Sequence, residues 1–382
     1  MLTELMAFGC AGVAGAGVVQ SAAGLALLMR QRREHAPMLT EWPAITVLKP
    51  LCGGESLLDA ALRSFCAQDY PKFQIVFGVQ SAADAALEEV DRLRRQFPHL
   101  DMDIVINGER HGRNSKIGNL INMYPAARHE VIVISDSDIH APPDLLRSVA
   151  GALRAPGVGL VTTLYTGMPS SRTLSGALGA AQINHSFLPG ALMARGLGRQ
   201  DCLGAVMALQ SDTLDRIGGL AALKDQIADD ALLGRLVRAQ GLRVALASAI
   251  PATTVPETRL PALVSHELRW MRTVKSVAPI GFPFGAAQYP LFWATLMLAA
   301  APDALTAWFA FGLVWIARGV LAARVDSILR TTGRLRFWYL PFRDALSVVI
   351  MVASYWSNRV AWRGQEYRVT SLSEAVLQPG KG

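Results

Sequence analysis

The chain has 382 residues, of which 51% are hydrophobic and only 18% are charged, fewer than the quarter usual in soluble domains. We therefore expect one soluble domain joined to membrane segments. The net charge is +7, but Arg and Lys lie beside apolar stretches instead of forming aromatic-interleaved basic clusters, so we expect no nucleic-acid partner. The four cysteines form no CxxC pair, which argues against a zinc site or a disulfide framework.

The first apolar stretch predicts an N-terminal transmembrane helix over residues 1–30. Residues 5–29 contain no charged residue, and a span needs roughly 20 mostly apolar residues. A signal peptide fits less well, because Arg30, Arg32 and Arg33 follow the apolar stretch and no basic segment precedes it. By the positive-inside rule, the residues after this helix are predicted to be cytoplasmic. Its small residues, Gly17 among them, are suited to packing against another helix.

Short apolar runs that alternate with helical patterns predict an α/β domain. The predicted strands cover residues 45–48, 73–79, 103–106, 131–135, 159–165 and 243–247, and the predicted helices 56–68, 85–97, 144–154 and 229–240. Strands that alternate with helices favour a mostly parallel sheet with right-handed crossovers. We expect this domain to cover residues 31–282.

The run Val131-Ile-Val-Ile-Ser-Asp-Ser-Asp138 has the strongest functional pattern. Its apolar residues suit a strand buried on both faces, so Asp136 and Asp138 would lie at the carboxyl edge where open α/β sheets bind ligands. Two carboxylates at this spacing can converge on a hard cation, which in turn can hold a diphosphate. The alternative is a polar turn that caps the following helix.

Other polar residues follow predicted strands or open helices. Asp84 follows the second strand, and Lys116 lies in the polar segment 111–119 after the third. Asp229 and Asp230 open a later helix, where capping alone would explain them.

Two further segments are predicted at the membrane surface. Residues 174–209 are apolar but too often interrupted to span a bilayer, so we interpret them as an interfacial, acceptor-side segment. Residues 258–276 predict a helix that carries His266, Arg269 and Trp270. Arginine and an indole are suited to a diphosphate and its sugar, although a helix facing lipid headgroups fits equally well.

The C-terminal part contains three candidate spans, 285–301, 304–323 and 342–360, so residues 283–362 are predicted to form membrane helices and 363–382 a tail. The arginines between the second and third candidates predict a cytoplasmic loop. The third is weakened by Arg343 and Asp344 and either spans or lies re-entrant. The aromatics Phe282, Phe284, Tyr289 and Trp293 are expected in the interfacial belt.

Taken in order, these motifs resemble the ceramide glucosyltransferase family, and within it the bacterial hopanoid-biosynthesis-associated glycosyltransferases. The resemblance covers nearly the whole chain. It rests on Val47-Leu-Lys-Pro-Leu51, Ser64-Phe-Cys-Ala-Gln-Asp-Tyr-Pro71, Phe77-Gly-Val-Gln80, Asn119-Leu-Ile-Asn-Met123, Ser135-Asp-Ser-Asp-Ile139, Ala228-Asp-Asp230, His266-Glu-Leu-Arg-Trp270 and Trp362-Arg363.

The resemblance implies a GT-A type nucleotide-sugar fold that faces the cytosol and inverts the anomeric carbon. Asp84 matches the aspartate expected at uracil and ribose, and Asp136 and Asp138 match the DxD motif expected at Mg²⁺ or Mn²⁺ and diphosphate. Asp230 matches the expected catalytic base. Arg269 and Trp270 match the end of a (Q/R)xxRW motif, in which His266 replaces Gln or Arg.

The implied activity is transfer of glucose or N-acetylglucosamine from a UDP-sugar to a membrane lipid hydroxyl. Lys116, His266, Arg269 and Trp270 are expected to bind the donor with Asp84 and Asp136. The acceptor is expected to be a hopanoid, with ceramide as the alternative, and the location a bacterial inner membrane, multi-pass. A processive polysaccharide synthase would need more spans, and a non-enzymatic scaffold would not need carboxylates at strand ends.

Overall fold

The structure, a computed structural model, describes residues 2–34, 39–362 and 365–368. Contacts divide the chain into two compact units. Arg32–Tyr165 and Gly198–Thr254 form one, here called the sheet unit, and the other described residues form the helical unit. This division differs from a domain at 31–282, because Thr166–Leu197 and the described residues from Val255 onward pack with the helical unit.

The sheet unit contains a seven-stranded sheet with the order β3-β2-β1-β4-β8-β6-β9. The strands are β1 (Ile45–Pro50), β2 (Phe73–Val79), β3 (Asp101–Ile106), β4 (Val131–Ser135), β6 (Val158–Thr162), β8 (Val206–Gln210) and β9 (Arg243–Leu246). Strands β3, β2, β1 and β4 are parallel, as are β6 and β9, whereas β8 is antiparallel to β4 and β6. The predicted mostly parallel sheet is therefore present.

Strand β8 corrects the interpretation of residues 174–209 as one interfacial segment. Residues 206–210 form a strand inside the sheet, and Val206–Leu209 are buried. A four-residue apolar run after glycine-rich sequence does not distinguish a buried strand from part of a helix. Residues 174–196 are helical, as α6 (Leu174–Gln182), a π-helical turn (Ile183–Phe187) and α7 (Leu188–Gly196).

Helices cover both faces of the sheet. The helices of this unit are α2 (Leu58–Cys66), α3 (Ala86–Gln96), α4 (Ser115–Met123), α5 (Leu145–Leu153), α8 (Ser211–Arg216) and α9 (Asp229–Ala239). Apolar residues of α2, α3 and α5 join Val47, Phe77 and Val133 of the sheet in one buried cluster. Helix α4 lies on the opposite face, where Gly78 leaves room for Met123 because a Cβ there would lie 2.3 Å from the Met123 side chain. A short pair, β5 (Ile139–His140) and β10 (Ala252–Val255), lies beyond β4.

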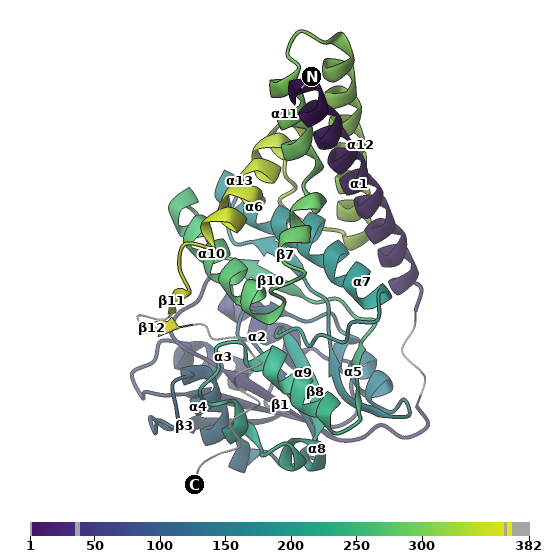
Figure 1. Cartoon of the computed structure of the whole chain (residues 1–382). Helices are drawn as coiled ribbons and strands as arrows, with labels where there is room; N and C mark the ends of the chain where they lie inside the picture. Colours follow the sequence, from purple (N-terminus) through teal and green to yellow (C-terminus); the bar gives the residue numbers. More distant parts are fainter. Residues whose placement is uncertain (1, 35–38, 363–364, 369–382) are drawn as a thin grey trace. The chain divides into compact units, whose positions relative to one another are not determined.

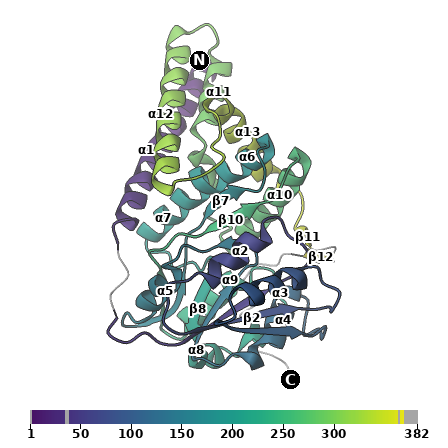
Figure 2. The ribbon, with the colours of Figure 1, turned by 180° about the vertical axis from the view of Figure 1, so that it is seen from behind.

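The helical unit contains α1, α6, α7 and the helices that follow Val255 (Figures 1 and 2). Its longer helices are α1 (Leu2–Gln31), α10 (Leu260–Val277), α11 (Pro290–Ala300), α12 (Leu305–Leu329) and α13 (Leu340–Ala353), and it also contains β7 (Thr166–Pro169) and the pair β11 (Arg359–Trp362) and β12 (Gln365–Arg368). Gly17 of α1 permits the expected close packing, because a Cβ there would lie 2.2 Å from the Ala287 carbonyl oxygen. Gly24 packs similarly against Pro189 of α7.

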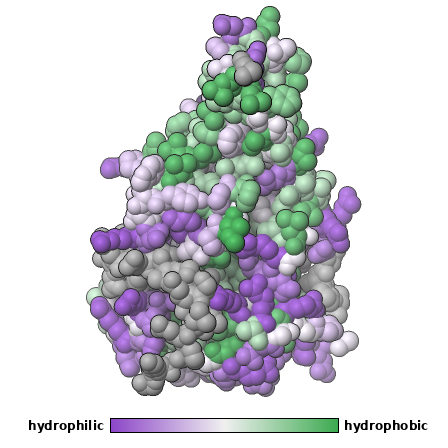
Figure 3. Space-filling view, viewed as in Figure 1, coloured by the Kyte–Doolittle hydropathy of each residue, from purple (hydrophilic) through white to green (hydrophobic). Residues whose placement is uncertain are grey.

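Two helices in the described residues, α1 and α12, are long and apolar enough to cross a membrane by length and composition. Apolar residues gather on the surface over α1, α11 and α12 (Figure 3). The other candidate spans are shorter, because residues 283–300 divide into a 3₁₀ turn and the 11-residue α11, and α13 has 14 residues.

Two of the aromatic residues expected in the interfacial belt, Phe282 and Tyr289, lie inside the protein instead. Phe282 and Tyr289 are buried within the helical unit, where they pack with Val348 and Met351, whereas Phe284 is 77% exposed. Arg343 and Asp344 are buried as well, in ion pairs with Glu267 and Arg318. Aromatic identity does not reveal which rings fill the interior of a helical bundle.

Candidate active site

The candidate site lies at the carboxyl edge of β4. The strand ends at Ser135, and Asp136 and Asp138 follow, as the sequence predicts. Thr253 Oγ1 of β10 donates to Asp138 Oδ2 at 2.6 Å, so the β5–β10 pair holds this turn. Burial and the neighbouring charge of Asp136 raise the pKa of Asp138 to about 6.

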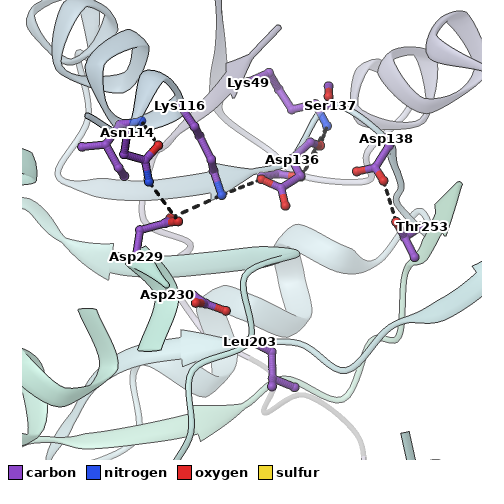
Figure 4. A network of polar contacts seen from close by, with 12 residues as sticks. Lys49, Asn114, Lys116, Asp136, Ser137, Asp138, Leu203, Asp229, Asp230 and Thr253 are labelled. Carbon is purple, nitrogen blue, oxygen red and sulfur yellow. Dashed lines mark hydrogen bonds and ion pairs between the residues drawn. The ribbon is translucent and has the colours of Figure 1, made fainter. Parts of the chain in front are cut away.

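Lys116 connects this turn to a second pair of acidic residues (Figure 4). Asn114 caps α4 by accepting from the Ile117 N–H at 3.1 Å, which places Lys116 in the first helical turn. The Lys116 ammonium lies 2.7 Å from Asp136 Oδ1 and 3.4 Å from Asp229 Oδ2. Burial alone would lower the pKa of Lys116, but Asp136 and Asp229 outweigh it and raise the pKa, so Lys116 is cationic here.

Asp229 and Asp230 open α9 and lie across the site from Asp136 and Asp138 (Figure 4). The Asp229 carboxylate is buried and accepts from Asn114 Nδ2 at 3.4 Å. Asp230 Oδ1 accepts from the Ala231 N–H at 2.7 Å. Burial and the charge of Asp229 raise the pKa of Asp230 to about 7. Gly204 leaves space beside it, since a Cβ there would lie 3.1 Å from Asp230 Oδ2.

Asp84 lies at the same edge, after β2. Its Oδ1 accepts from the Gly53 N–H at 2.8 Å and the Ala86 N–H at 2.9 Å. Gly53 adopts φ +73°, a conformation that favours glycine, and belongs to the loop after β1. In the same loop, Glu55 accepts from the hydroxyl of Ser137, the middle residue of the DxD motif. The β1 loop thus connects the Asp84 turn to the Asp136–Asp138 turn.

Sequence reasoning missed Lys49, at the end of β1. Its ammonium is fully buried, donates to Ser135 Oγ and to the Asp136 carbonyl oxygen, and lies 4.1 Å from the Phe65 ring centroid. Burial lowers the pKa of Lys49 to about 7. The available signal was a lysine at the carboxyl end of a buried strand. The sequence likewise did not predict that Asp229 contacts Lys116 or that Glu55 contacts Ser137.

The carboxylates of Asp136 and Asp138 are suited to a divalent cation that also binds a ligand. No group of three or more His, Cys, Asp or Glu side chains suited to a metal occurs within the described residues. Asp136 and Asp138 offer two carboxylates at one turn, and the charge of Asp136 raises the pKa of Asp138, a repulsion that a cation would relieve. Mg²⁺ is commonly bound by one or two carboxylates together with phosphate oxygens and water.

His266, Arg269 and Trp270 lie on α10, in the helical unit. Nδ1 of His266 contacts the Glu257 carboxylate, and its ring lies edge-on to Trp270 at 5.4 Å between centroids. The sheet unit therefore brings together Asp84, Lys116, Asp136, Asp138 and Asp230 at one edge, whereas a role of the α10 residues in that site remains a prediction.

A family model and two similar proteins all indicate a glycosyltransferase family. A family model described as Glycosyl transferase family 21 matches residues 11–375. Ceramide glucosyltransferase 1 of Caenorhabditis elegans is 35% identical over 108 residues, which are 28% of this chain and 23% of that protein. Ceramide glucosyltransferase of Komagataella phaffii is 32% identical over 113 residues, 28% of this chain and 22% of that protein. These matches thus span less than a quarter of either relative.

A solved structure supports the fold. The mannosyltransferase PcManGT from Pyrobaculum calidifontis, in complex with GDP-Man and Mn²⁺, superposes with a TM-score of 0.56 at 19% identity, covering 93% of this chain and 99% of that chain. The predicted GT-A fold and the resemblance to ceramide glucosyltransferases are confirmed. Because the family model covers nearly the whole sequence, the chain belongs to glycosyl transferase family 21.

Proposed function

We propose that this chain is an inverting, metal-dependent membrane glycosyltransferase. It transfers glucose or N-acetylglucosamine from a UDP-sugar to a hydroxyl of a membrane lipid, which we propose is a hopanoid such as bacteriohopanetetrol. The convergence of Lys116, Asp136 and Asp230 from three elements at one sheet edge is the observation that carries the proposal. Family membership and two span-length apolar helices support it.

On the donor side, each residue has a separate task. Asp84 would bind uracil and ribose, while Asp136 and Asp138 would hold Mg²⁺ or Mn²⁺. When bound, that cation would stabilise negative charge on the diphosphate. Lys116, which is cationic beside Asp136, would stabilise the same charge as UDP departs. We further propose that His266, Arg269 and Trp270 bind the donor.

On the acceptor side, Asp230 would act as the general base. It takes the proton of the lipid hydroxyl while that oxygen forms a bond to the anomeric carbon. The bond from this carbon to UDP breaks on the opposite face, and UDP leaves with the electron pair, so the configuration inverts. A pKa of about 7 suits this role, because a base is most effective when its pKa lies near the working pH.

The acceptor class gives a reason for membrane attachment. Each buried CH₂ group favours the bilayer by about 0.8 kcal/mol, so a long-chain or polycyclic lipid does not leave the bilayer readily. We propose a multi-pass protein of the bacterial inner membrane with the sheet unit in the cytoplasm. The arginines that follow α1 and α12, among them Arg33 and Arg330, are consistent with this orientation.

An assay with defined lipids tests the function. The purified chain in nanodiscs is incubated with labelled UDP-glucose, UDP-N-acetylglucosamine or UDP-galactose and with bacteriohopanetetrol or ceramide, and the lipids are analysed by mass spectrometry. We expect glycosylated hopanoid. Product from ceramide alone would support the ceramide glucosyltransferase alternative, and a polymer would support a polysaccharide synthase. No labelled product under any condition would contradict all three.

A further inference from the structure

A buried carboxylate lies against His266 in the helical unit. Glu257, which follows β10 by two residues, places Oε1 against Nδ1 of His266, nine residues later on α10. The Glu257 side chain is 9% exposed and that of His266 is 32% exposed. The carboxylate therefore lies inside the unit and the imidazole near its surface.

The second oxygen of Glu257 adds an independent observation. Oε2 is buried and has no hydrogen-bond partner among the described residues. A buried carboxylate with an unsatisfied oxygen is costly unless its remaining contact is strong. His266 supplies that contact. Because an ionised carboxylate only accepts hydrogen bonds, Nδ1 of His266 carries the hydrogen between them.

Neighbouring contacts fix the position of the imidazole. The His266 ring lies edge-on to Trp270, one helical turn later. The next residue of α10, Glu267, accepts two hydrogen bonds from Arg343 of α13, at 2.8 and 2.7 Å. Helix rotation about its axis would break these contacts. With Nδ1 engaged by Glu257, Nε2 is the ring nitrogen left for another ligand.

We propose that Glu257 is a positioning residue that holds His266 with Nδ1 protonated and Nε2 presented to the nucleotide-sugar donor. The inference deepens the proposed function and rests on it, because His266 is a donor-binding residue only in that function. It also explains how histidine serves where related motifs have Gln or Arg. A lone imidazole can rotate or change tautomer, whereas a carboxylate behind it fixes one arrangement.

A double-mutant cycle tests whether Glu257 acts through His266. Steady-state constants for the UDP-sugar are measured for wild type, Glu257→Gln, His266→Gln and the double variant, with thermal unfolding as a check on folding. Glu88→Gln, on the exposed face of α3, is the matched control. In the wild-type background, we expect Glu257→Gln to raise KM about tenfold, the size expected for the loss of one charge-assisted hydrogen bond. In the His266→Gln background, we expect the same substitution to raise KM by less than about twofold, because the contact is already lost. Equal effects in both backgrounds would overturn the proposal.

A second measurement does not depend on activity. Protein labelled with ¹⁵N-histidine is examined in nanodiscs by long-range ¹H–¹⁵N correlation, and His266→Gln identifies the His266 signals. We expect a protonated Nδ1 in wild type and in Glu88→Gln, and a change in the protonated nitrogen in Glu257→Gln. Unchanged His266 signals in Glu257→Gln would overturn the positioning role. If the tautomer changes but wild type transfers no sugar, the proposed function fails and the Glu257–His266 relationship stands.

Discussion

Lys116 Nζ lies 2.7 Å from Asp136 Oδ1, so the first turn of α4 and the end of β4 place opposite charges in one site. The same ammonium lies 3.4 Å from Asp229 Oδ2 at the start of α9. The Lys116 ammonium therefore connects the proposed donor-binding turn to the helix that carries the proposed base.

Replacing Lys116 with methionine should impair catalysis. The variant removes a positive charge beside the leaving diphosphate, and Asp136 and Asp229 lose their ion pairs with the Lys116 ammonium. We expect kcat/KM to fall about 100-fold, the usual effect of removing one donor that stabilises transition-state charge. Lys116→Arg, which keeps the charge, should be less impaired. Activity of Lys116→Met within twofold of wild type would remove Lys116 from the mechanism.

Activity should depend on a divalent cation bound at Asp136 and Asp138. Dialysis against EDTA should abolish transfer, and Mg²⁺ or Mn²⁺ should restore it. Asp138→Asn should raise the cation concentration for half-maximal activity at least about tenfold, because a charged ligand is lost. The titration is followed by product formation. Full activity after dialysis would contradict the cation assignment.

The pH profile should report Asp230. Its pKa is raised to about 7, and a base accepts a proton only when ionised. We therefore expect kcat/KM to rise with pH by about tenfold per unit below pH 7 and to level off above it. Initial rates between pH 5.5 and 8.5 measure the profile, with unfolding checked at each pH. A flat profile across pH 7 would contradict a general base with this pKa.

The buried pair Glu267–Arg343 should contribute strongly to the stability of the helical unit. Its side chains are 5% and 1% exposed and form two hydrogen bonds. Removing one partner leaves a buried charge, so Arg343→Met should cost about 3–5 kcal/mol of unfolding free energy, whereas the double variant Glu267→Leu with Arg343→Met should recover much of it. Denaturant unfolding in detergent measures both.

An exposed ion pair provides the control for that prediction. Arg92 and Glu89 lie 2.8 Å apart on α3 with side chains 48% and 25% exposed. Arg92→Ala should change the unfolding free energy by less than about 1 kcal/mol, because solvent screens surface pairs. An equal loss for Arg92→Ala and Arg343→Met would contradict the role assigned to burial.

The sequence allowed prediction of most of the sheet unit. Strands β2 and β4 have the predicted bounds, because short segments rich in β-branched and aromatic residues between polar turns leave little ambiguity. The placement of Asp84 and Asp136 at one edge followed from parallel pairing alone. Strand β8 was missed, because a run of only four apolar residues does not distinguish a buried strand from part of a helix.

Contacts made by polar side chains inside the protein were harder to predict. Lys49, Glu257 and Arg343 are charged residues, and composition places such residues on the surface. Lys49 and Arg343 meet partners far away in the chain, as Arg343 contacts Glu267 across 76 positions. Only the folded arrangement shows which charged residues are paired and enclosed.

The most direct test of the proposed mechanism is transfer by Asp230→Asn in nanodiscs, measured beside binding of the UDP-sugar donor. The amide keeps the shape of the side chain but accepts no proton at working pH. We expect donor affinity within about threefold of wild type and a loss of lipid glycosylation of about 10²- to 10⁴-fold. Turnover near the wild-type rate would show that another group takes the proton and would contradict the central role of Asp230.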